Sequence, residues 1–226
     1  MMVERPLDHE LGELKKLVLT MAGEVERELM LAIRAVVERN AELGEQVIGA
    51  DEVIDRREIE VDRRIVELIV REKPLAGDLR LVMTAGKIAP DLERIADHAV
   101  NIARQAIMLA HVPPLKPFVT IPMMASEAAA MVRDAIGAFV HADAQHARNV
   151  IARDDNVDAM HEQVFRELLT YMMEDTKTIP RALALLLVSE SLERVADQAT
   201  NISEQVVYLV EAADIRHRHA ETEKQG

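Results

Sequence analysis

Apolar residues recur along this chain at steps of three and four, which is the period of one face of an α-helix. The pattern is clearest in two segments. Its apolar positions are Leu92, Ile95, Ala96, Ala99, Ile102, Ala103 and Ala106 in the first segment, and Leu192, Val195, Ala196, Ala199 and Ile202 in the second. Because many of these residues are alanines, neighbouring helices can approach one another closely. The pattern therefore predicts an all-α protein built from packed helical bundles.

Six helices are expected from this pattern and from the positions of the prolines. They span about residues 7–38, 41–71, 75–110, 123–141, 144–174 and 180–213. Prolines are densest at 113–117, and proline cannot donate to a helical ladder, so we expect a linker there. The predicted organisation is a three-helix unit at 1–112, the linker at 113–117, a second three-helix unit at 118–213 and a polar tail at 214–226. The tail contains His217 and His219, which we interpret as part of a frayed end rather than as metal ligands.

An internal repeat supports this division. Residues 92–102 read Leu-Glu-Arg-Ile-Ala-Asp-His-Ala-Val-Asn-Ile, residues 192–202 read Leu-Glu-Arg-Val-Ala-Asp-Gln-Ala-Thr-Asn-Ile, and eight of the eleven positions are identical. Upstream, Asp-Glu-Val-Ile-Asp at 51–55 resembles Asp-Asp-Asn-Val-Asp at 154–158, now at a shift of 103 residues. The different shift fits a change of length in the turn between the second and third helices. Each half is therefore predicted to be one copy of the same three-helix unit.

Each copy carries two acidic stripes that border its apolar face. The first copy has Glu93, Asp97 and Asn101 on its third helix, and Asp51, Asp55, Glu58 and Asp62 on its second helix. The second copy has Glu193, Asp197 and Asn201, together with Asp154, Asp158 and His161, where His161 takes the position of Glu58. Residues spaced four apart are neighbours on a helix, at about 6 Å. If the two helices pack antiparallel, the stripes meet and gather three to five ligand atoms in one place.

Such stripes are suited to holding a cation. Carboxylates at this spacing repel one another, and partial burial adds a desolvation cost that a bound positive ion reverses. Carboxylate and amide oxygens suit hard ions such as Mg, Ca and Mn, and also Fe. The imidazole of His161 shifts the second site towards Fe or Zn. The alternative is an ordinary solvated helix face, in which Arg94 pairs with Asp91 and Arg194 pairs with Glu190.

Composition excludes several other classes of protein. The net charge of −13 repels nucleic-acid phosphates, and the chain has three Phe, two Tyr and no Trp on which bases could stack. There is no cysteine, which excludes thiolate metal sites and cysteine catalysis. The longest uninterrupted apolar stretch, at 182–188, is far short of a membrane span, and the N-terminus shows no apolar signal segment. We therefore expect a cytoplasmic protein that does not bind nucleic acid.

The repeat and its acidic motifs resemble the PhoU family. The likeness extends from about residue 7 to 211 and includes Asp78-Leu79-Arg80 before the third helix and the Asp-x-x-(Ile/Val)-Asp elements at 51–55 and 154–158. Two departures are Ala96 and Ala196, where the family often has Gly before the motif Asp, and His161, which stands in place of an acid. The Ala changes favour helicity, whereas His161 leaves the metal of the second site open.

The resemblance implies two tandem three-helix bundles, commonly as a homodimer. It also implies metal clusters bound through Glu/Asp-x-x-x-Asp motifs, carried over here to Glu93, Asp97, Glu193 and Asp197, with Asp51, Asp55, Asp154 and Asp158 facing them. From the ligand types we expect divalent or ferric ions, namely Fe, Zn, Mn or Mg. The implied function is negative regulation of the phosphate-starvation response and of phosphate uptake. The implied partners are the ATPase subunit of the phosphate ABC transporter and a membrane sensor histidine kinase.

Three functional hypotheses follow from these observations. The first is a non-enzymatic regulatory adaptor that reaches the membrane only through protein partners. The second is a metal-dependent hydrolase that uses a carboxylate-bound water, although no general base is apparent beside the acidic stripes. The third is a purely structural helical bundle whose acidic residues bind nothing.

Overall fold

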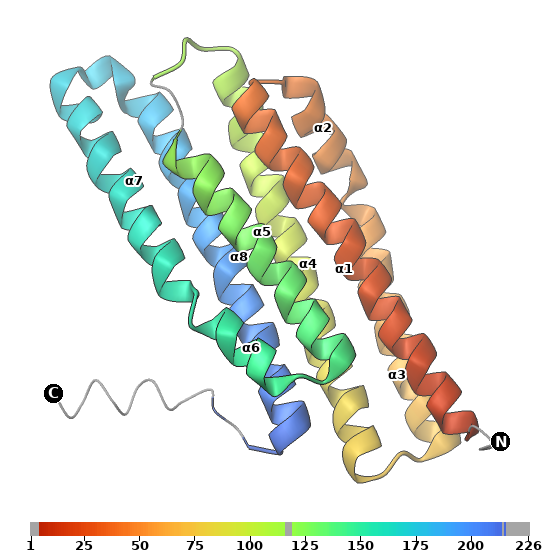
Figure 1. The fold of residues 1–226 in the computed structure, drawn as a ribbon. Helices are drawn as coiled ribbons and strands as arrows, with labels where there is room; N and C mark the ends of the chain where they lie inside the picture. Colours follow the sequence, from red (N-terminus) through yellow and green to blue (C-terminus); the bar gives the residue numbers. More distant parts are fainter. Residues whose placement is uncertain (1–4, 116–118, 214, 216–226) are drawn as a thin grey trace, which may run out of the picture.

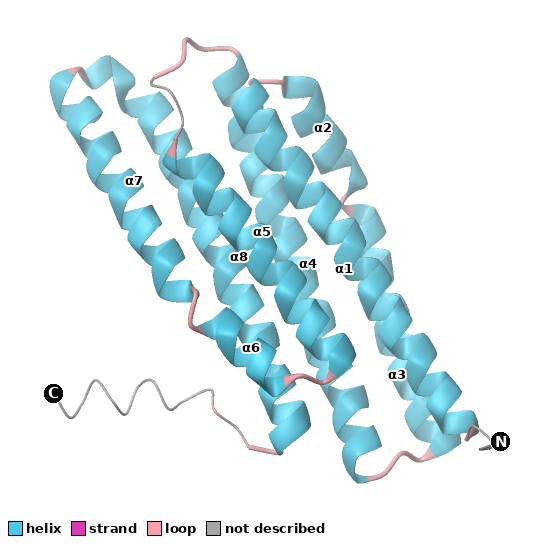
Figure 2. Cartoon of the chain, in the orientation of Figure 1, coloured by secondary structure: helices cyan, strands magenta, loops and turns pink. Residues whose placement is uncertain are grey.

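The structure is a computed structural model that describes residues 5–115, 119–213 and 215. Its helices are α1 (Pro6–Glu38), α2 (Ala41–Ala50), α3 (Glu52–Glu72), α4 (Ala76–Ala110), α5 (Thr120–His141), α6 (Ala144–Ile151), α7 (Asp154–Glu174), the 3₁₀ helix η1 (Thr176–Thr178) and α8 (Ile179–Glu211). No strand occurs among these residues (Figure 2), so the predicted all-α class is confirmed. Part of the linker predicted at 113–117 lies outside the described residues, as do His217 and His219.

The prediction of one continuous helix over 41–71, and of another over 144–174, is wrong. The first is divided at Asp51 into α2 and α3, and the second is divided after Ile151 into α6 and α7. The first break falls at Asp51, whose short polar side chain competes for backbone hydrogen bonds and favours helix starts over helix interiors. The second falls at Ala152 and Arg153, where the Arg153 side chain is bonded to α5. Each break leaves an acidic residue of the stripe, Asp51 or Asp154, at the start of the following helix, where the helix dipole favours negative charge.

The repeat is visible in the turns as well as in the sequence. Arg39 follows α1 and Ala142 follows α5, and both cap their helix in the left-handed conformation, with φ of 55° and 51°. The next residue then caps the following helix, since the side chain of Asn40 accepts from the amide of Leu43 and Asp143 accepts from that of His146. These pairs differ by 103 residues, so this shift holds throughout α1–α3 and α5–α7.

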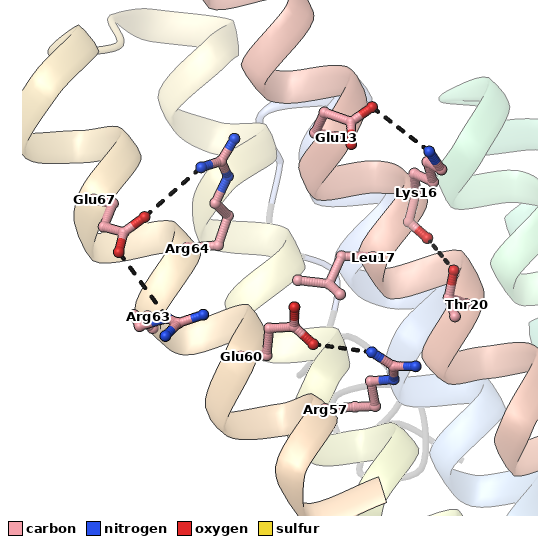
Figure 3. Close-up of a pocket in the computed structure, with 9 residues that line it drawn as sticks. All are labelled: Glu13, Lys16, Leu17, Thr20, Arg57, Glu60, Arg63, Arg64 and Glu67. Atoms are coloured by element: carbon pink, nitrogen blue, oxygen red, sulfur yellow. Dashed lines mark hydrogen bonds and ion pairs between the residues drawn. The ribbon is translucent and has the colours of Figure 1, made fainter. Parts of the chain in front are cut away.

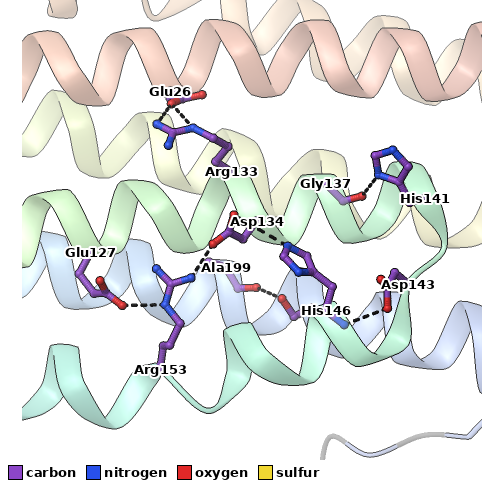
Figure 4. Close-up of polar contacts among 11 residues, drawn as sticks. Glu26, Glu127, Arg133, Asp134, Gly137, His141, Asp143, His146, Arg153 and Ala199 are labelled. Atoms are coloured by element: carbon purple, nitrogen blue, oxygen red, sulfur yellow. Dashed lines mark hydrogen bonds and ion pairs between the residues drawn. The ribbon is translucent and has the colours of Figure 1, made fainter.

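The two halves pack into one elongated body (Figure 1). α4 packs against α1 in the first half, α8 packs against α5 in the second, and α4 and α8 pack against each other between the halves. The alanines of the repeat, including Ala96, Ala99 and Ala196, are buried at these contacts, as the apolar pattern predicted. α1 and α5 are also joined directly, because Arg133 Nε donates to Glu26 at 2.9 Å (Figure 4). None of the described helices is both long and apolar enough to cross a membrane.

Candidate metal centres

The first acidic cluster consists of Asp51, Asp55, Glu58, Glu93 and Asp97. α3 and α4 are joined by a short turn and pack side by side, which brings the stripe on α3 towards the stripe on α4. Electrostatic interactions run between the two helices, because Asp51 interacts with Asp97, and Glu93 interacts with both Glu58 and Asp55. The meeting of the two stripes that the sequence predicted therefore occurs in the first half.

The ionised form of this cluster is destabilised by burial and by mutual repulsion of its carboxylates. Burial, and then repulsion from Asp55 and Asp97, raises the pKa of Asp51 above its ordinary value. Burial first, and neighbouring carboxylates second, likewise raise the pKa values of Glu58 and Glu93. Arg94 and Arg104 offset only part of this repulsion. The first acidic cluster therefore has an excess of negative charge that a cation would relieve.

Glu28 is a sixth acidic residue at this place, and it lies outside the stripes that the sequence pattern predicts. Its side chain lies on α1 and is 1% exposed, and neither carboxylate oxygen has a hydrogen-bond partner. Burial, followed by the charge of Asp51, raises its pKa from 4.5 to about 7. A signal for it exists in the sequence, because Glu28 interrupts a heptad-like series of buried residues: Leu14, Val18, Met21, Val25, Glu28, Ala32 and Ala35.

The second acidic cluster consists of Asp154, Asp158 and His161 on α7 and Asp197 on α8. Burial, then repulsion from Asp158 and Asp197, raises the pKa of Asp154 to about 6. Burial, and then repulsion from Asp197, likewise raises the pKa of Asp158. One carboxylate oxygen of Asp154 is buried without a hydrogen bond of ordinary geometry, and an interaction with the hydroxyl of Thr200 on α8 offsets only part of the rise in its pKa.

The position of Asp154 is fixed by the preceding residue. Arg153 lies at the break between α6 and α7, and its guanidinium donates to Glu127 at 2.7 Å and to Asp134 at 2.5 Å on α5 (Figure 4). These charge-assisted bonds hold the start of α7 against α5. Because Asp154 follows directly, its backbone is held in place by the same contacts.

His161 is oriented by a hydrogen bond to α8. Its Nδ1 lies 3.1 Å from Ser189 Oγ, and Ser189 donates its own hydroxyl proton to the carbonyl of Leu186 at 2.9 Å. Ser189 therefore accepts from His161, which places the imidazole proton on Nδ1 and leaves the Nε2 lone pair available to a metal. Metal-ligating histidines are commonly oriented in this way by an outer partner.

Two predicted ligands have partners on their own helices. Asn101 accepts from Arg104 at 3.3 Å, and Asn201 donates to Gln198 at 3.4 Å. Glu193 is half-buried on α8. Its role as a ligand of the second ion stays a prediction.

The alternative arginine pairs are partly present. Arg94 pairs with Asp91 at 3.0 Å, as predicted. Arg194 pairs with Asp197 at 3.1 Å, and the predicted pair with Glu190 is wrong. Glu190 and Asp197 are both within one helical turn of Arg194, and the guanidinium is turned towards Asp197. This surface pair occupies one oxygen of Asp197, so an ion at the second acidic cluster competes with Arg194.

Neither cluster is a preformed metal site. Within residues 5–115, 119–213 and 215, no three His, Asp or Glu side chains are arranged so that they could hold a metal ion as they stand. The residues nevertheless fit a hard cation in kind, since they offer carboxylate oxygens and unsatisfied buried acceptors at Glu28 and Asp154. Binding therefore requires rotamer changes that turn these side chains towards one another.

A groove of about 300 Å³ between α1 and α3 is also lined mainly by charged side chains (Figure 3). Unlike the charges of the two acidic clusters, those of the groove are of both signs and compensate one another. Arg57 makes a two-pronged pair with Glu24, with both distances 3.0 Å, and a third bond to Glu60 at 3.0 Å. Arg64 pairs with Glu67 and Glu10. Because its cations already have carboxylate partners, the groove lacks the charge imbalance found at the two acidic clusters.

The fold and the two clusters together define a class of protein, namely a tandem pair of helical bundles with an acidic cluster in each half. A family model described as the PhoU domain matches this chain twice, over residues 18–106 and 121–206. The chain therefore belongs to the PhoU family.

Similar proteins span nearly its whole length. A protein from Aquifex aeolicus named phosphate-specific transport system accessory protein PhoU homolog is 43% identical over 210 residues, which are 93% of this chain and 95% of that protein. The Escherichia coli K12 protein named phosphate-specific transport system accessory protein PhoU is 36% identical, over 92% of this chain and 86% of its own. The crystal structure of PhoU from Pseudomonas aeruginosa matches with a TM-score of 0.86 at 37% identity, covering 91% of this chain and 99% of that one.

Proposed function

We propose that this protein is a regulatory accessory protein of phosphate uptake and a negative regulator of the phosphate-starvation response. In this role it is not an enzyme. It acts on the cytoplasmic side of the membrane, as a homodimer, between the ATPase subunit of a phosphate ABC transporter and a sensor histidine kinase. The observation that carries the proposal is the likeness, over nine tenths of the chain, to proteins named as accessory to phosphate-specific transport.

Metal binding at the two acidic clusters is the second part of the proposal. In the first cluster Asp51, Asp55, Glu93 and Asp97 would hold the ion, and in the second Asp154, Asp158, His161 and Asp197 would hold it. A bound cation would neutralise carboxylates whose pKa values are raised by burial and mutual repulsion. It would also join α3 to α4 and α7 to α8. The all-oxygen set of the first cluster suits Mn, Mg or Fe, and the imidazole of the second favours Fe or Zn.

Exposed apolar side chains support docking to a protein partner. On α3 and α4, and again on α7 and α8, large apolar residues lie exposed near the turn that joins the two helices. They are Val66, Val70 and Met83 in the first half, and Leu169, Met173 and Leu183 at the corresponding positions of the second. Repetition of exposed apolar residues at equivalent places favours a contact surface over chance. We call these six residues the paired apolar patches.

The hydrolase alternative gains no support from the contact between His161 and Ser189. A nucleophilic serine must be reachable by substrate and must give its proton to the base. Ser189 is fully buried, and it donates its proton to the carbonyl of Leu186. The pair therefore orients the imidazole and does not activate a nucleophile.

Gene deletion tests the regulatory proposal. We expect phosphate-starvation genes to be expressed even in high phosphate when the gene is deleted, and repression to return when the wild-type gene is restored. Tagged protein should retain the transporter ATPase on purification from membranes solubilised in detergent. Normal repression by phosphate in a deletion strain that has no second copy would overturn the proposal.

A further inference from the structure

Glu28 is a charged residue at a position that the fold otherwise gives to an apolar side chain. The repeat aligns Glu28 on α1 with Met131 on α5, at the shift of 103 residues that also aligns the caps Asn40 and Asp143. Both side chains are buried in the same place of their bundle, at 1% and 0% exposure. The second half therefore fills the equivalent buried position with an apolar side chain.

No hydrogen bond compensates the burial of the Glu28 carboxyl group. Buried carboxylates are normally paired or hydrogen-bonded, because an unpaired one is costly. Both oxygens of Glu28 lack a hydrogen bond, and the strongest charge acting on it is the carboxylate of Asp51, which repels it. Arg27, the residue before Glu28 on α1, offsets this repulsion only in part. A purely structural role leaves the carboxyl neutral and its hydrogen-bonding capacity unused.

We propose that Glu28 is a metal ligand contributed by α1 to the first acidic cluster, so that the first ion is held by three helices. This inference rests on the metal binding proposed above and adds a residue to it. The ligand set then comes from α1, from the junction of α2 and α3, and from α4, and the ion fixes α1 to the α3–α4 pair. The second acidic cluster has no such third contribution, because Met131 takes the equivalent place.

The two ion sites are consequently unlike. The first gains a carboxylate from inside the bundle, in surroundings that exclude water, and is the more selective for a hard ion such as Mn²⁺. The second relies on α7 and α8 alone and includes the imidazole of His161. One scaffold thus presents an all-oxygen site and a mixed nitrogen–oxygen site.

Titration with Mn²⁺ alone, followed by electron paramagnetic resonance of the free ion, tests the role of Glu28. The second site is first weakened by Asp197→Asn, so that the remaining binding reports on the first. In this background we compare Glu28→Gln, which keeps the size of the side chain, and Glu28→Met, which copies the second half. Glu13→Gln is the matched control, because Glu13 lies on the same helix and is exposed beside Lys16.

We expect Glu28→Gln and Glu28→Met each to weaken Mn²⁺ binding about 10- to 100-fold, as loss of groups that support a metal site commonly does, while Glu13→Gln leaves it unchanged. Unchanged binding in either folded Glu28 variant would overturn the role of Glu28 and leave the metal proposal intact. Absence of Mn²⁺, Fe and Zn binding in the wild-type chain would instead overturn the metal proposal, and this inference with it. Circular dichroism of each variant confirms that it is folded.

Discussion

Replacing Glu28 by glutamine should make the stability of the metal-free protein less dependent on pH. Burial and the nearby charge of Asp51 raise the pKa of Glu28 from 4.5 to about 7 in the folded chain. Because the folded pKa lies above the unfolded one, its contribution to stability is complete below pH 4.5 and is lost as the pH rises through 7. At roughly 1.4 kcal/mol per pKa unit, this difference amounts to about 3 kcal/mol.

Glutamine cannot ionise, so the variant does not suffer this loss. Its buried amide has a cost of its own, but that cost is the same at every pH and cancels from the comparison. We therefore expect the free energy of unfolding of Glu28→Gln, relative to wild type, to rise by about 2 to 3 kcal/mol between pH 5 and pH 8.

Urea unfolding of chelator-treated protein, followed by circular dichroism across this range, measures the difference. The exposed control Glu13→Gln should show no such trend. The difference in free energy of unfolding between Glu28→Gln and wild type could instead stay constant within about 0.5 kcal/mol from pH 5 to pH 8. That result would contradict a raised pKa of Glu28, because it would mean that Glu28 titrates alike in the folded and unfolded chain.

Three further predictions concern other parts of the molecule. Ser189→Ala removes the acceptor that orients His161, so Zn²⁺ affinity at the second acidic cluster should fall about tenfold in a competition assay, with Mn²⁺ binding at the first cluster unchanged. Met173→Asp, at a side chain that is 79% exposed, should abolish co-purification of the transporter ATPase while leaving the melting temperature nearly unchanged. Leu19→Asp, at an exposed residue outside the paired apolar patches, should leave both the co-purification and the melting temperature nearly unchanged. Arg39→Ala removes a guanidinium that donates to the carbonyls of Leu109 and Val112, and it should lower the free energy of unfolding by about 1 to 3 kcal/mol in urea titrations.

Much of the fold could be predicted because it depends on local periodicity and on repetition. The period of three and four in residues 92–106 located the buried face of α4, and the recurrence at 192–202 located its counterpart in α8. The breaks at Asp51 and after Ile151 were missed. Apolar periodicity continues across them, and the break depends on contacts with other helices, such as the one that Arg153 makes with α5.

The candidate sites could be predicted only in part. Spacing along one helix identified Glu93 and Asp97, and the shift between copies identified Asp154 and Asp158, because these relations lie within one element or one repeat. Asn101 and Asn201 were placed in the stripes, but each has a partner on its own helix. Glu28 was missed because its relation to Asp51 joins separate helices, although its place in a buried heptad series was visible in the sequence.

Cation binding at the two acidic clusters is the premise of the metal proposal and of the role given to Glu28. Elemental analysis of the protein, purified without chelator, tests this directly when wild type is compared with the double variants Glu93→Gln/Asp97→Asn and Glu193→Gln/Asp197→Asn. We expect bound metal in the wild type and loss of part of it in each double variant, with the first losing Mn or Fe and the second losing Fe or Zn. Metal-free wild type, or the same metal content in all three proteins, would contradict this premise.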